Sequence, residues 1–414
     1  MKTIDIIPSK SDAHRALICA ALAEYMGGTM CDIELGFLSK DTEATRKCLV
    51  ALLARGTTAT GASLYCGESG STFRFLLPVA GALGMRCAFY PRGRLAKRPM
   101  EPLSRELRAK GMSVSEEGSV PFMAEGQLGS GDFHLPGNVS SQFVSGLLFA
   151  LPMLEGDSRI IVDGRLESSR YVDMTIKTQR DFGIEGTVIE ESGKGVVISV
   201  RGGQTYRAPR NYRVEGDWSN AAFWILAGVL GDEPIAIKGL DQDSLQGDKA
   251  FAEVLIKAGA DIVLPPDDSE GRLIASPSRG KLRAFTHDAS GTPDLVPALA
   301  LAASVAEGTS LIHGAARLRI KESDRLRAIS STLGNLGADI EEYRDKLVIR
   351  GKKSLGGGTI ESFGDHRIAM MGAVASLVCD EKVSLIGADA VSKSYPGFFE
   401  TFEELGLSGG LELI

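Results

Sequence analysis

The chain repeats one pattern along its length, and this repeat constrains the fold more than any other feature. Polar motifs open apolar helical runs at six positions spaced 60 to 78 residues apart: Ser11, Ser71, Ser141, Ser219, Asp294 and Asp365. A second pattern, an amphipathic helix that ends in glycine before a strand, recurs at Gly111, Gly259 and Gly337. Together they predict six α/β units of roughly 70 residues. We expect two similar α/β domains of three units each.

The composition and the charge argue against several classes of protein. The chain is 43% hydrophobic and 24% charged, with a net charge of −7, whereas nucleic-acid binding needs a broad basic face. The chain contains no run of about 18 uncharged apolar residues, the length that a membrane-spanning helix needs. The six cysteines have neither CxxC spacing nor a neighbouring histidine set. We therefore expect a cytoplasmic protein that binds neither nucleic acid nor membrane and has no metal site or disulfide.

The motif Lys321-Glu322-Ser323-Asp324-Arg325 places a carboxylate between two cations. Apolar residues at helical spacing follow it as far as Leu336, so we expect a helix from Ser323 to Leu336 with Ser323 as its N-cap. A helix start attracts anions through its unpaired N–H groups and its dipole. Glu322 held there is suited to proton transfer. For this segment alone, a capping box followed by surface ion pairs is the favoured reading.

Five other helix starts share this design. Each combines small hydroxyl residues, glycine or aspartate, and several have a lysine or arginine nearby; they are residues 10–15, 68–74, 138–142, 291–294 and 364–367. One such start usually serves only as a cap. Five of them favour phosphate binding. We expect their loops to face one another across a cleft between the domains.

Several motifs, in their order along the chain, resemble the enolpyruvyl transferase family. They include Ser9-Lys10-Ser11, the loop at residues 94–100, residues 168–173, the motif at 321–325 and Ser392-Lys393-Ser394-Tyr395-Pro396. The resemblance spans the whole chain. It implies two similar domains, each of three βαβαββ units in an inside-out α/β barrel, that close around substrates without a cofactor. We place the first domain at residues 1–9 and 214–414, and the second, inserted domain at residues 10–213.

The resemblance implies transfer of the enolpyruvyl group of phosphoenolpyruvate to the 5-hydroxyl of shikimate 3-phosphate, with release of phosphate. The methylene carbon must gain a proton while the attacking hydroxyl loses one, so the reaction needs an acid and a base. By resemblance, Glu322 is the proton donor and Asp294 is the base. Lys10 can share either duty.

The resemblance also assigns substrate contacts. Those expected for shikimate 3-phosphate are Lys10, Ser11, Arg15, Ser140, Ser141, Ser168, Tyr171, Asp294 and Lys321. Those expected for phosphoenolpyruvate are Lys10, Gly70, Arg98, Gln142, Arg325, Arg367 and Lys393. Arginine offers paired donors to carboxylate and phosphate, and glycine lets the backbone approach an anion. The family inhibitor glyphosate, an anion, is expected to lie against Gly70 and to compete with phosphoenolpyruvate for that site.

Three positions receive no ligand role. Glu68 and Arg317 stand where related sequences often carry asparagine, and Arg74 is expected to be a structural partner inside its helix.

Two other functions remain open. A sister enzyme that acts on UDP-N-acetylglucosamine usually has a reactive cysteine in the loop before Arg98, and residues 91–98 contain none. The second is a non-catalytic phosphometabolite-binding protein. The carboxylates at 294 and 322 argue against it, because they would weaken the binding of an anionic ligand. A monomer is expected.

Overall fold

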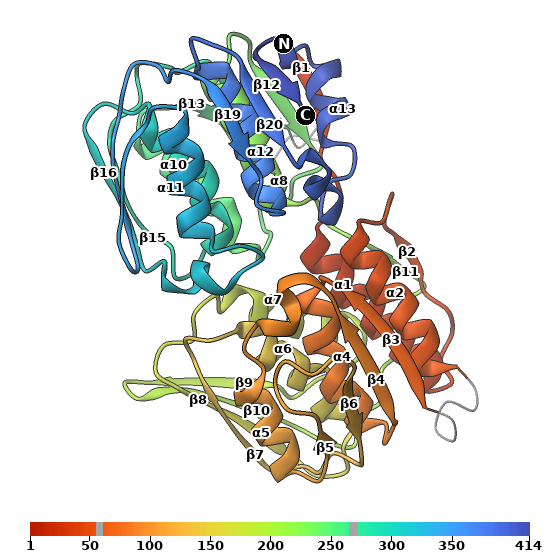
Figure 1. Cartoon of the computed structure of the whole chain (residues 1–414). Coiled ribbons are helices and arrows are strands. Elements are labelled where there is room, and N and C mark those ends of the chain that lie inside the picture. The colour runs from red at the N-terminus through yellow and green to blue at the C-terminus, as the bar shows by residue number, and fades with distance from the viewer. Residues whose placement is uncertain (55–60, 265–271) are drawn as a thin grey trace. The chain divides into compact units, whose positions relative to one another are not determined.

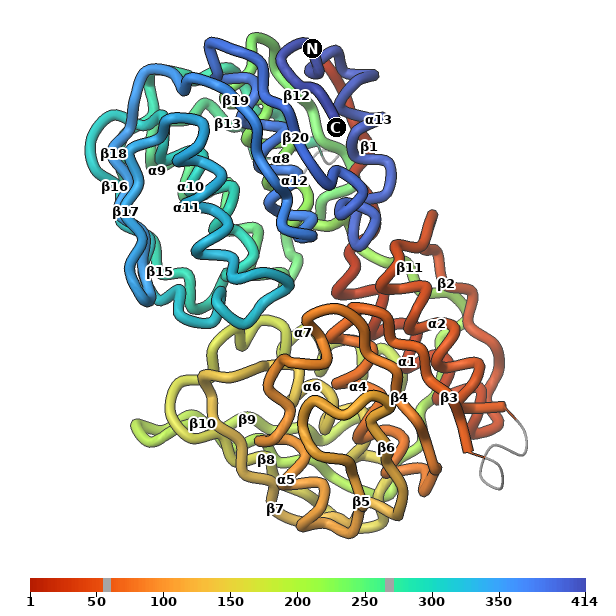
Figure 2. The backbone as a smooth tube through the Cα atoms, viewed as in Figure 1, coloured from red at the N-terminus to blue at the C-terminus, as the bar shows by residue number. Residues whose placement is uncertain are grey.

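The chain folds into two compact units. The computed structural model describes residues 1–54, 61–264 and 272–414 (Figures 1 and 2). Unit 1 contains Met1–Ser9 and Glu215–Ile414, and unit 2 contains Lys10–Val214. The chain therefore starts in unit 1, forms unit 2 and returns to unit 1. The expected inserted domain, residues 10–213, ends one residue before unit 2 ends.

Unit 2 contains two four-stranded sheets with equivalent strand orders. One has the order β3 (Ala62–Gly67), β4 (Cys87–Pro91), β6 (Phe122–Glu125), β5 (Ser113–Val114). The other has the order β7 (Asp132–Pro136), β8 (Ser158–Asp163), β10 (Gly195–Val200), β9 (Val188–Ser192). In both sheets the first pair is parallel and the other pairs are antiparallel. A separate parallel pair joins β11 (Asn211–Arg213) to β2 (Asp32–Glu34).

Unit 1 repeats this design. Its four-stranded sheets have the orders β1 (Lys2–Asp5), β12 (Ile235–Lys238), β14 (Leu273–Ser276), β13 (Asp261–Val263) and β15 (Thr286–Asp288), β16 (Thr309–His313), β18 (Leu347–Arg350), β17 (Asp339–Glu342). Each again begins with a parallel pair and continues antiparallel. A third, parallel sheet has the order β19 (Gly358–Glu361), β20 (Val383–Ile386), β21 (Leu411–Leu413).

The helices connect these strands in a recurring order. Along the chain, β7, α6 (Ser141–Ala150), β8, α7 (Arg170–Asp181), β9 and β10 follow one another, which is a βαβαββ unit. The same order recurs with α4 (Gly70–Ala82) and α5 (Glu101–Ala109), and with α10 (Val296–Ser304) and α11 (Arg325–Asn335). The α/β fold class with repeated βαβαββ units is therefore confirmed.

Buried helices form the core of each unit. In unit 1, every residue of α8 (Trp218–Leu230), α10 and α12 (His366–Ala375) is buried, as expected for helices that are apolar on all sides. Figure 1 shows labelled strands of unit 1 on either side of these helices. In unit 2, α4 packs along α6. The other α-helices within the described residues are α1 (Lys10–Tyr25), α2 (Lys40–Leu53), α9 (Ala250–Lys257) and α13 (Phe398–Glu404).

The start of α11 corrects one prediction. The helix begins at Arg325, and its N-cap is Asp324, whose side chain accepts a hydrogen bond from the backbone N–H of Arg327 (3.2 Å). The expected cap, Ser323, instead donates its hydroxyl to Asp365 (3.0 Å). A longer-range partner, which local spacing does not reveal, thus takes the Ser323 hydroxyl.

Among the described helices, none combines the length and apolarity that a membrane crossing requires.

Candidate active site

Arg325 lies at the centre of a buried ionic cluster in unit 1. Its side chain is 1% exposed. It donates from Nη1 to Asp294 (2.7 Å), from Nη2 to Glu322 (2.7 Å) and from Nε to Asp365 (2.9 Å). Burial opposes the charge of the guanidinium, but Asp365, Glu322 and Asp294 raise the pKa of Arg325 above its usual range. One side chain thus holds both the expected base and the expected proton donor.

Asp294 is bound by two further cations. Arg367 Nη2 lies 3.2 Å from one carboxylate oxygen, and Lys321 Nζ lies 3.7 Å from the other. Burial alone would raise the pKa of Asp294, but Arg367, Lys321 and Arg325 lower it well below its usual range. The carboxylate is therefore ionised and weakly basic in this arrangement. Because a general base works best with a pKa near the working pH, the expected role of Asp294 as base would require that its cations be drawn away first.

Two neighbouring groups titrate nearer to neutral pH than usual. Burial lowers the pKa of Lys321 to about 8. Burial, followed by the charge of Asp294, raises the pKa of Asp248 to about 6. Asp248 also accepts a hydrogen bond from the hydroxyl of Ser219 in the first turn of α8. Perturbed titration of this kind is typical of functional sites.

Lys393 lies beside the start of α12. Its Nζ donates to the carbonyl oxygen of Gly364 (2.7 Å). Asp365, the N-cap of α12, accepts from the backbone N–H of Arg367 (3.0 Å). The side chain of Asp365 therefore orients both Arg325 and the helix that carries Arg367. Five expected residues of unit 1 form this cluster, and Lys393 lies beside one of its helices.

Gly70, Arg98 and Gln142 lie close together in unit 2. A Cβ placed on Gly70, the first residue of α4, would lie 3.1 Å from Arg98 Nη1 and 3.3 Å from Gln142 Oε1. Arg74 Nη1 donates to Gln142 Oε1 (2.8 Å), and Gln142 Nε2 donates to Ser71 Oγ (3.0 Å). Three expected phosphoenolpyruvate contacts thus meet where α4 and α6 begin. Arg74 acts as a structural partner, as expected.

Arg15 connects Ser11 and Tyr171, two of the residues expected to contact shikimate 3-phosphate. It is 2% exposed and donates to the backbone oxygens of Ser11 (2.5 Å) and Tyr171 (2.7 Å) and to the hydroxyl of Thr175 (2.9 Å). Burial lowers the pKa of Arg15 to about 10, so it remains charged at neutral pH. Its contacts favour a positioning role for Arg15 over direct ligand contact. Lys10, at the start of α1, forms an ion pair with Asp41 (3.0 Å).

The remaining expected serines lie at two helix starts. Ser140 is the N-cap of α6 and accepts from the backbone N–H of Gln142 (3.3 Å), and Ser141 is the first residue of that helix. Ser168 lies two residues before the first residue of α7 and has a φ of 58°. This left-handed conformation is uncommon for a residue other than glycine. Such strain tends to occur at functional sites.

A model of the family "EPSP synthase (3-phosphoshikimate 1-carboxyvinyltransferase)" matches residues 1–402. The chain belongs to the EPSP synthase family. A 3-phosphoshikimate 1-carboxyvinyltransferase of Clostridium novyi is 41% identical over 97% of this chain and 94% of its own. One from Clostridium kluyveri is 42% identical, with the same coverage. The chain is therefore a transferase of the shikimate pathway, which serves aromatic amino-acid biosynthesis.

Solved structures agree with membership of the EPSP synthase family. The EPSP synthase of Acinetobacter baumannii superposes with a TM-score of 0.79 at 26% identity, covering 98% of this chain and 95% of its own. The enolpyruvyl transferase NikO from Streptomyces tendae has a TM-score of 0.71 at 20% identity, with the same coverage, and supports the fold alone. These findings favour EPSP synthase activity over the UDP-N-acetylglucosamine and non-catalytic alternatives.

Sequence reasoning left some residues of this EPSP synthase cluster without a role. Local sequence patterns mark Asp365 as a helix start and do not single out Asp248. The signal for Asp248 is the segment Gln246-Gly247-Asp248, which precedes the amphipathic helix α9. Arg317 lies close enough to help lower the pKa of Lys321. Among the described residues, no three His, Cys, Asp or Glu side chains gather as potential metal ligands.

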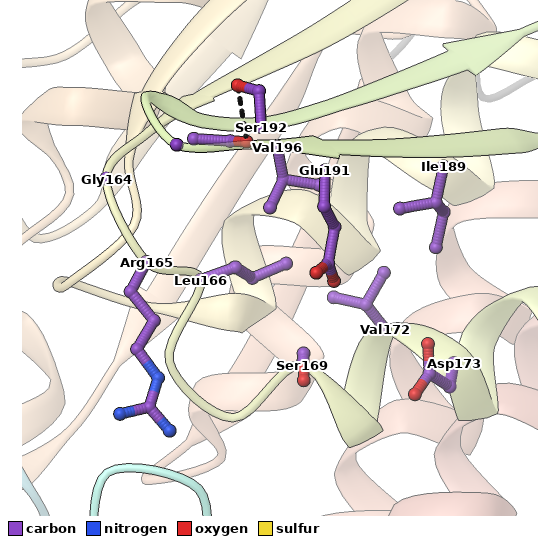
Figure 3. Close-up of a pocket in the computed structure, with 12 residues that line it drawn as sticks. Gly164, Arg165, Leu166, Ser169, Val172, Asp173, Ile189, Glu191, Ser192 and Val196 are labelled. Atoms are coloured by element: carbon purple, nitrogen blue, oxygen red, sulfur yellow. Dashed lines mark hydrogen bonds between the residues drawn. The ribbon is translucent and has the colours of Figure 1, made fainter.

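Unit 2 of this EPSP synthase also contains a cavity of about 370 Å³. The loop from Gly164 to Leu166, the start of α7 and the β9–β10 hairpin line it (Figure 3). Figure 3 shows the Glu191 side chain extending from the hairpin toward Leu166. None of the expected substrate contacts is among the lining residues, although Ser169, the neighbour of Ser168, is. We assign no substrate to this cavity.

Proposed function

We propose that this chain transfers the enolpyruvyl group of phosphoenolpyruvate to the 5-hydroxyl of shikimate 3-phosphate, with Glu322 and Asp294 as its acid and base. The observation that carries the residue roles is that both carboxylates bind the same buried guanidinium, that of Arg325, at 2.7 Å each. Acid and base groups are thereby held by one rigid side chain. Positioned proton transfer of this kind contributes about 10²–10⁴-fold to rate.

The proposed reaction consists of an addition and an elimination. Glu322 gives a proton to the methylene carbon of phosphoenolpyruvate, and the 5-hydroxyl oxygen forms a bond to the neighbouring carbon as Asp294 takes its proton. The bond from that carbon to the phosphate oxygen then breaks, and Asp294 gives its proton to the leaving phosphate. The Glu322 carboxylate takes one proton from the methyl group, which restores the double bond. Lys10, on unit 2, is the further candidate for one of these proton transfers.

Substrate binding should itself activate the proposed base. The pKa of Asp294 is held down by Arg367, Lys321 and Arg325. Arg325 and Arg367 are the groups proposed to bind phosphoenolpyruvate, and Lys321 the group proposed to bind shikimate 3-phosphate. Once these cations share their charge with substrate phosphate and carboxylate groups, Asp294 regains basicity. The base would then become effective only when both substrates are bound.

The remaining substrate contacts are proposed from both units. For phosphoenolpyruvate they are Gly70, Arg98 and Gln142 of unit 2 and Lys393 of unit 1. For shikimate 3-phosphate they are Ser11, Ser140, Ser141, Ser168 and Tyr171 of unit 2, with Arg15 as the residue that positions Ser11 and Tyr171. The cluster at Gly70 supports the first set, because a helix start that lies beside an arginine suits an anionic group.

An acceptor comparison tests the proposal. Purified protein is incubated with phosphoenolpyruvate and either shikimate 3-phosphate or UDP-N-acetylglucosamine, and phosphate release is followed. We expect phosphate release when the acceptor is shikimate 3-phosphate and none when it is UDP-N-acetylglucosamine. Release with the nucleotide sugar would support the sister activity, and tight binding without release would support a non-catalytic role.

We further propose that the protein acts as a monomer in the cytoplasm. Sedimentation would then give a mass near the chain mass of 44.0 kDa. A sedimentation mass near twice this value, independent of concentration, would contradict the monomer.

A further inference from the structure

Helices α1 and α2 of unit 2 are joined by two polar contacts one helical turn apart. Lys10 Nζ pairs with the Asp41 carboxylate at 3.0 Å. One turn further along both helices, His14 Nδ1 lies 2.7 Å from the hydroxyl of Thr45. The two helices therefore begin at the same end and keep a fixed register. Lys10 belongs to the first contact, so that register sets its position.

Both contacts lead to one residue of α4. The hydroxyl of Thr72 lies 2.6 Å from that of Thr45 and donates toward the Ser69 hydroxyl (2.7 Å) and the Asp41 carbonyl (3.4 Å). Ser69 is the N-cap of α4, and Gly70 is the first residue of that helix. We call His14, Thr45, Thr72 and Ser69 the α1–α4 relay. Its hydrogen bonds run from the middle of α1 to the start of α4.

One arrangement of the hydroxyl hydrogens satisfies every contact of the relay. Thr72 directs its single hydroxyl hydrogen to Ser69 and accepts from Thr45. Thr45 then accepts from His14, which in this arrangement carries its proton on Nδ1. Each relay member is thus matched to the next as donor to acceptor.

His14 is held in this neutral form by its surroundings. It is 1% exposed, and burial, followed by the charges of Lys10 and Arg15, lowers the pKa of His14 well below its usual range. Its Nε2 has no hydrogen-bond partner among the described residues. A buried polar atom without a partner is costly, so packing alone does not explain a histidine at this position. A requirement for an Nδ1–H group that donates to Thr45 explains why a histidine stands at position 14.

We propose that His14, Thr45 and Thr72 are positioning residues that hold the start of α4, with Gly70, in place relative to Lys10. This inference rests on the proposed function, in which Gly70 and Lys10 contact phosphoenolpyruvate. The space around Gly70 is tight, because a Cβ there would lie 3.1 Å from Arg98 and 3.3 Å from Gln142. A small shift of the α4 start would therefore change the groups that face the anion, and misplacement by about 1 Å can cost 10²-fold in rate.

Paired substitutions separate hydrogen bonding from packing. Thr45→Val and Thr72→Val keep the shape and remove the hydroxyl, whereas Thr45→Ser and Thr72→Ser keep the hydroxyl and remove the methyl group. Thr178→Val is the matched control, because Thr178 is a buried helical threonine whose hydroxyl donates to the Met174 carbonyl (3.0 Å), outside the relay. Steady-state kinetics are measured with each substrate varied in turn, together with the thermal midpoint.

We expect each valine variant to raise KM for phosphoenolpyruvate about tenfold, a modest part of the effect that misplacement can have. KM for shikimate 3-phosphate should change less than about twofold, and the serine variants and Thr178→Val should resemble wild type in both constants. His14→Asn, whose amide can replace the Nδ1–H donor, should retain a KM near wild type, and His14→Leu should behave like the valine variants. This second pair decides the matter if a valine variant does not fold.

Three outcomes would overturn the inference: equal kinetics for the valine and serine variants, equal shifts in both KM values, or the same shift in Thr178→Val. A wild-type protein that transfers no enolpyruvyl group would instead overturn the proposed function. The two failures are therefore distinguishable.

Discussion

Arg325 and Asp365 form an ion pair of 2.9 Å in which the side chains are 1% and 0% exposed. Removing one partner of a buried pair costs about 3–5 kcal/mol. In Asp365→Ala, Arg325 keeps Asp294 and Glu322, but its Nε, the Ser323 hydroxyl and the Arg367 backbone N–H lose this buried acceptor. We therefore expect Asp365→Ala to lower the free energy of unfolding by about that amount. Urea denaturation measures it.

The matched control is an exposed pair in the same unit. Arg350 and Asp339 lie 3.1 Å apart, with side chains 47% and 44% exposed. Asp339→Ala should cost less than about 1 kcal/mol. Equal losses in the two variants would show that the buried pair has no special role.

Glu322→Gln should preserve substrate binding and lose turnover. The amide keeps the shape and can still accept from Arg325, but it has no acidic proton to give. We expect kcat to fall on the order of 10²-fold or more, with KM values close to wild type. Glu400→Gln, at an exposed position in α13, is the control and should leave kcat unchanged. Wild-type turnover in Glu322→Gln would remove Glu322 from the role of proton donor.

Gly70→Ala should raise KM for phosphoenolpyruvate and weaken inhibition by glyphosate. The added methyl group would contact Arg98 and Gln142 at 3.1 and 3.3 Å, which narrows the anion pocket. KM for shikimate 3-phosphate should change much less. Gly334→Ala is the matched control, because a Cβ at this helical glycine meets nothing within 4 Å. Unchanged inhibition in Gly70→Ala would place Gly70 away from the anion.

Asp248 should make the protein less stable as pH rises from about 4 to about 6. Burial raises the pKa of Asp248 to about 6 from an ordinary value of 3.8, so within this window the folded chain keeps a proton that the unfolded chain has released. The resulting stability is fully present below the unfolded pKa and is lost as pH rises through the folded one. The difference between the two values corresponds to about 3 kcal/mol.

Unfolding of wild type and Asp248→Asn at pH 4 and pH 7 measures this contribution. The variant cannot titrate at this position. The contributions of all other titrating groups to the pH dependence therefore cancel when the two proteins are compared. Relative to the variant, wild type should lose about 2 kcal/mol of stability between the two pH values, because the unfolded group is already partly ionised at pH 4. A constant difference would mean that the pKa of Asp248 is not raised.

The repeat and the helix starts were predictable from sequence because they rest on local spacing. Polar motifs at regular intervals indicated the repeated α/β units, whereas the βαβαββ order was implied by the family resemblance; Gly70 and Ser141 are the first residues of α4 and α6. Interactions between distant segments were not predictable in this way. Ser323 is locally a good cap, but its hydroxyl is used by Asp365, 42 residues away. Arg15 has the charge of a phosphate ligand, and three of its five N–H groups donate to residues of α1 and α7, which its position in the sequence does not reveal.

The central claim, that this chain transfers an enolpyruvyl group through protonation of the methylene carbon, is tested most directly by NMR of the reaction in D₂O. Wild type with phosphoenolpyruvate and shikimate 3-phosphate should form one enol ether for each phosphate released, with deuterium in the product methylene group. Glu322→Gln should form little product. Phosphate release without an enol ether, or an enol ether free of deuterium, would contradict the mechanism.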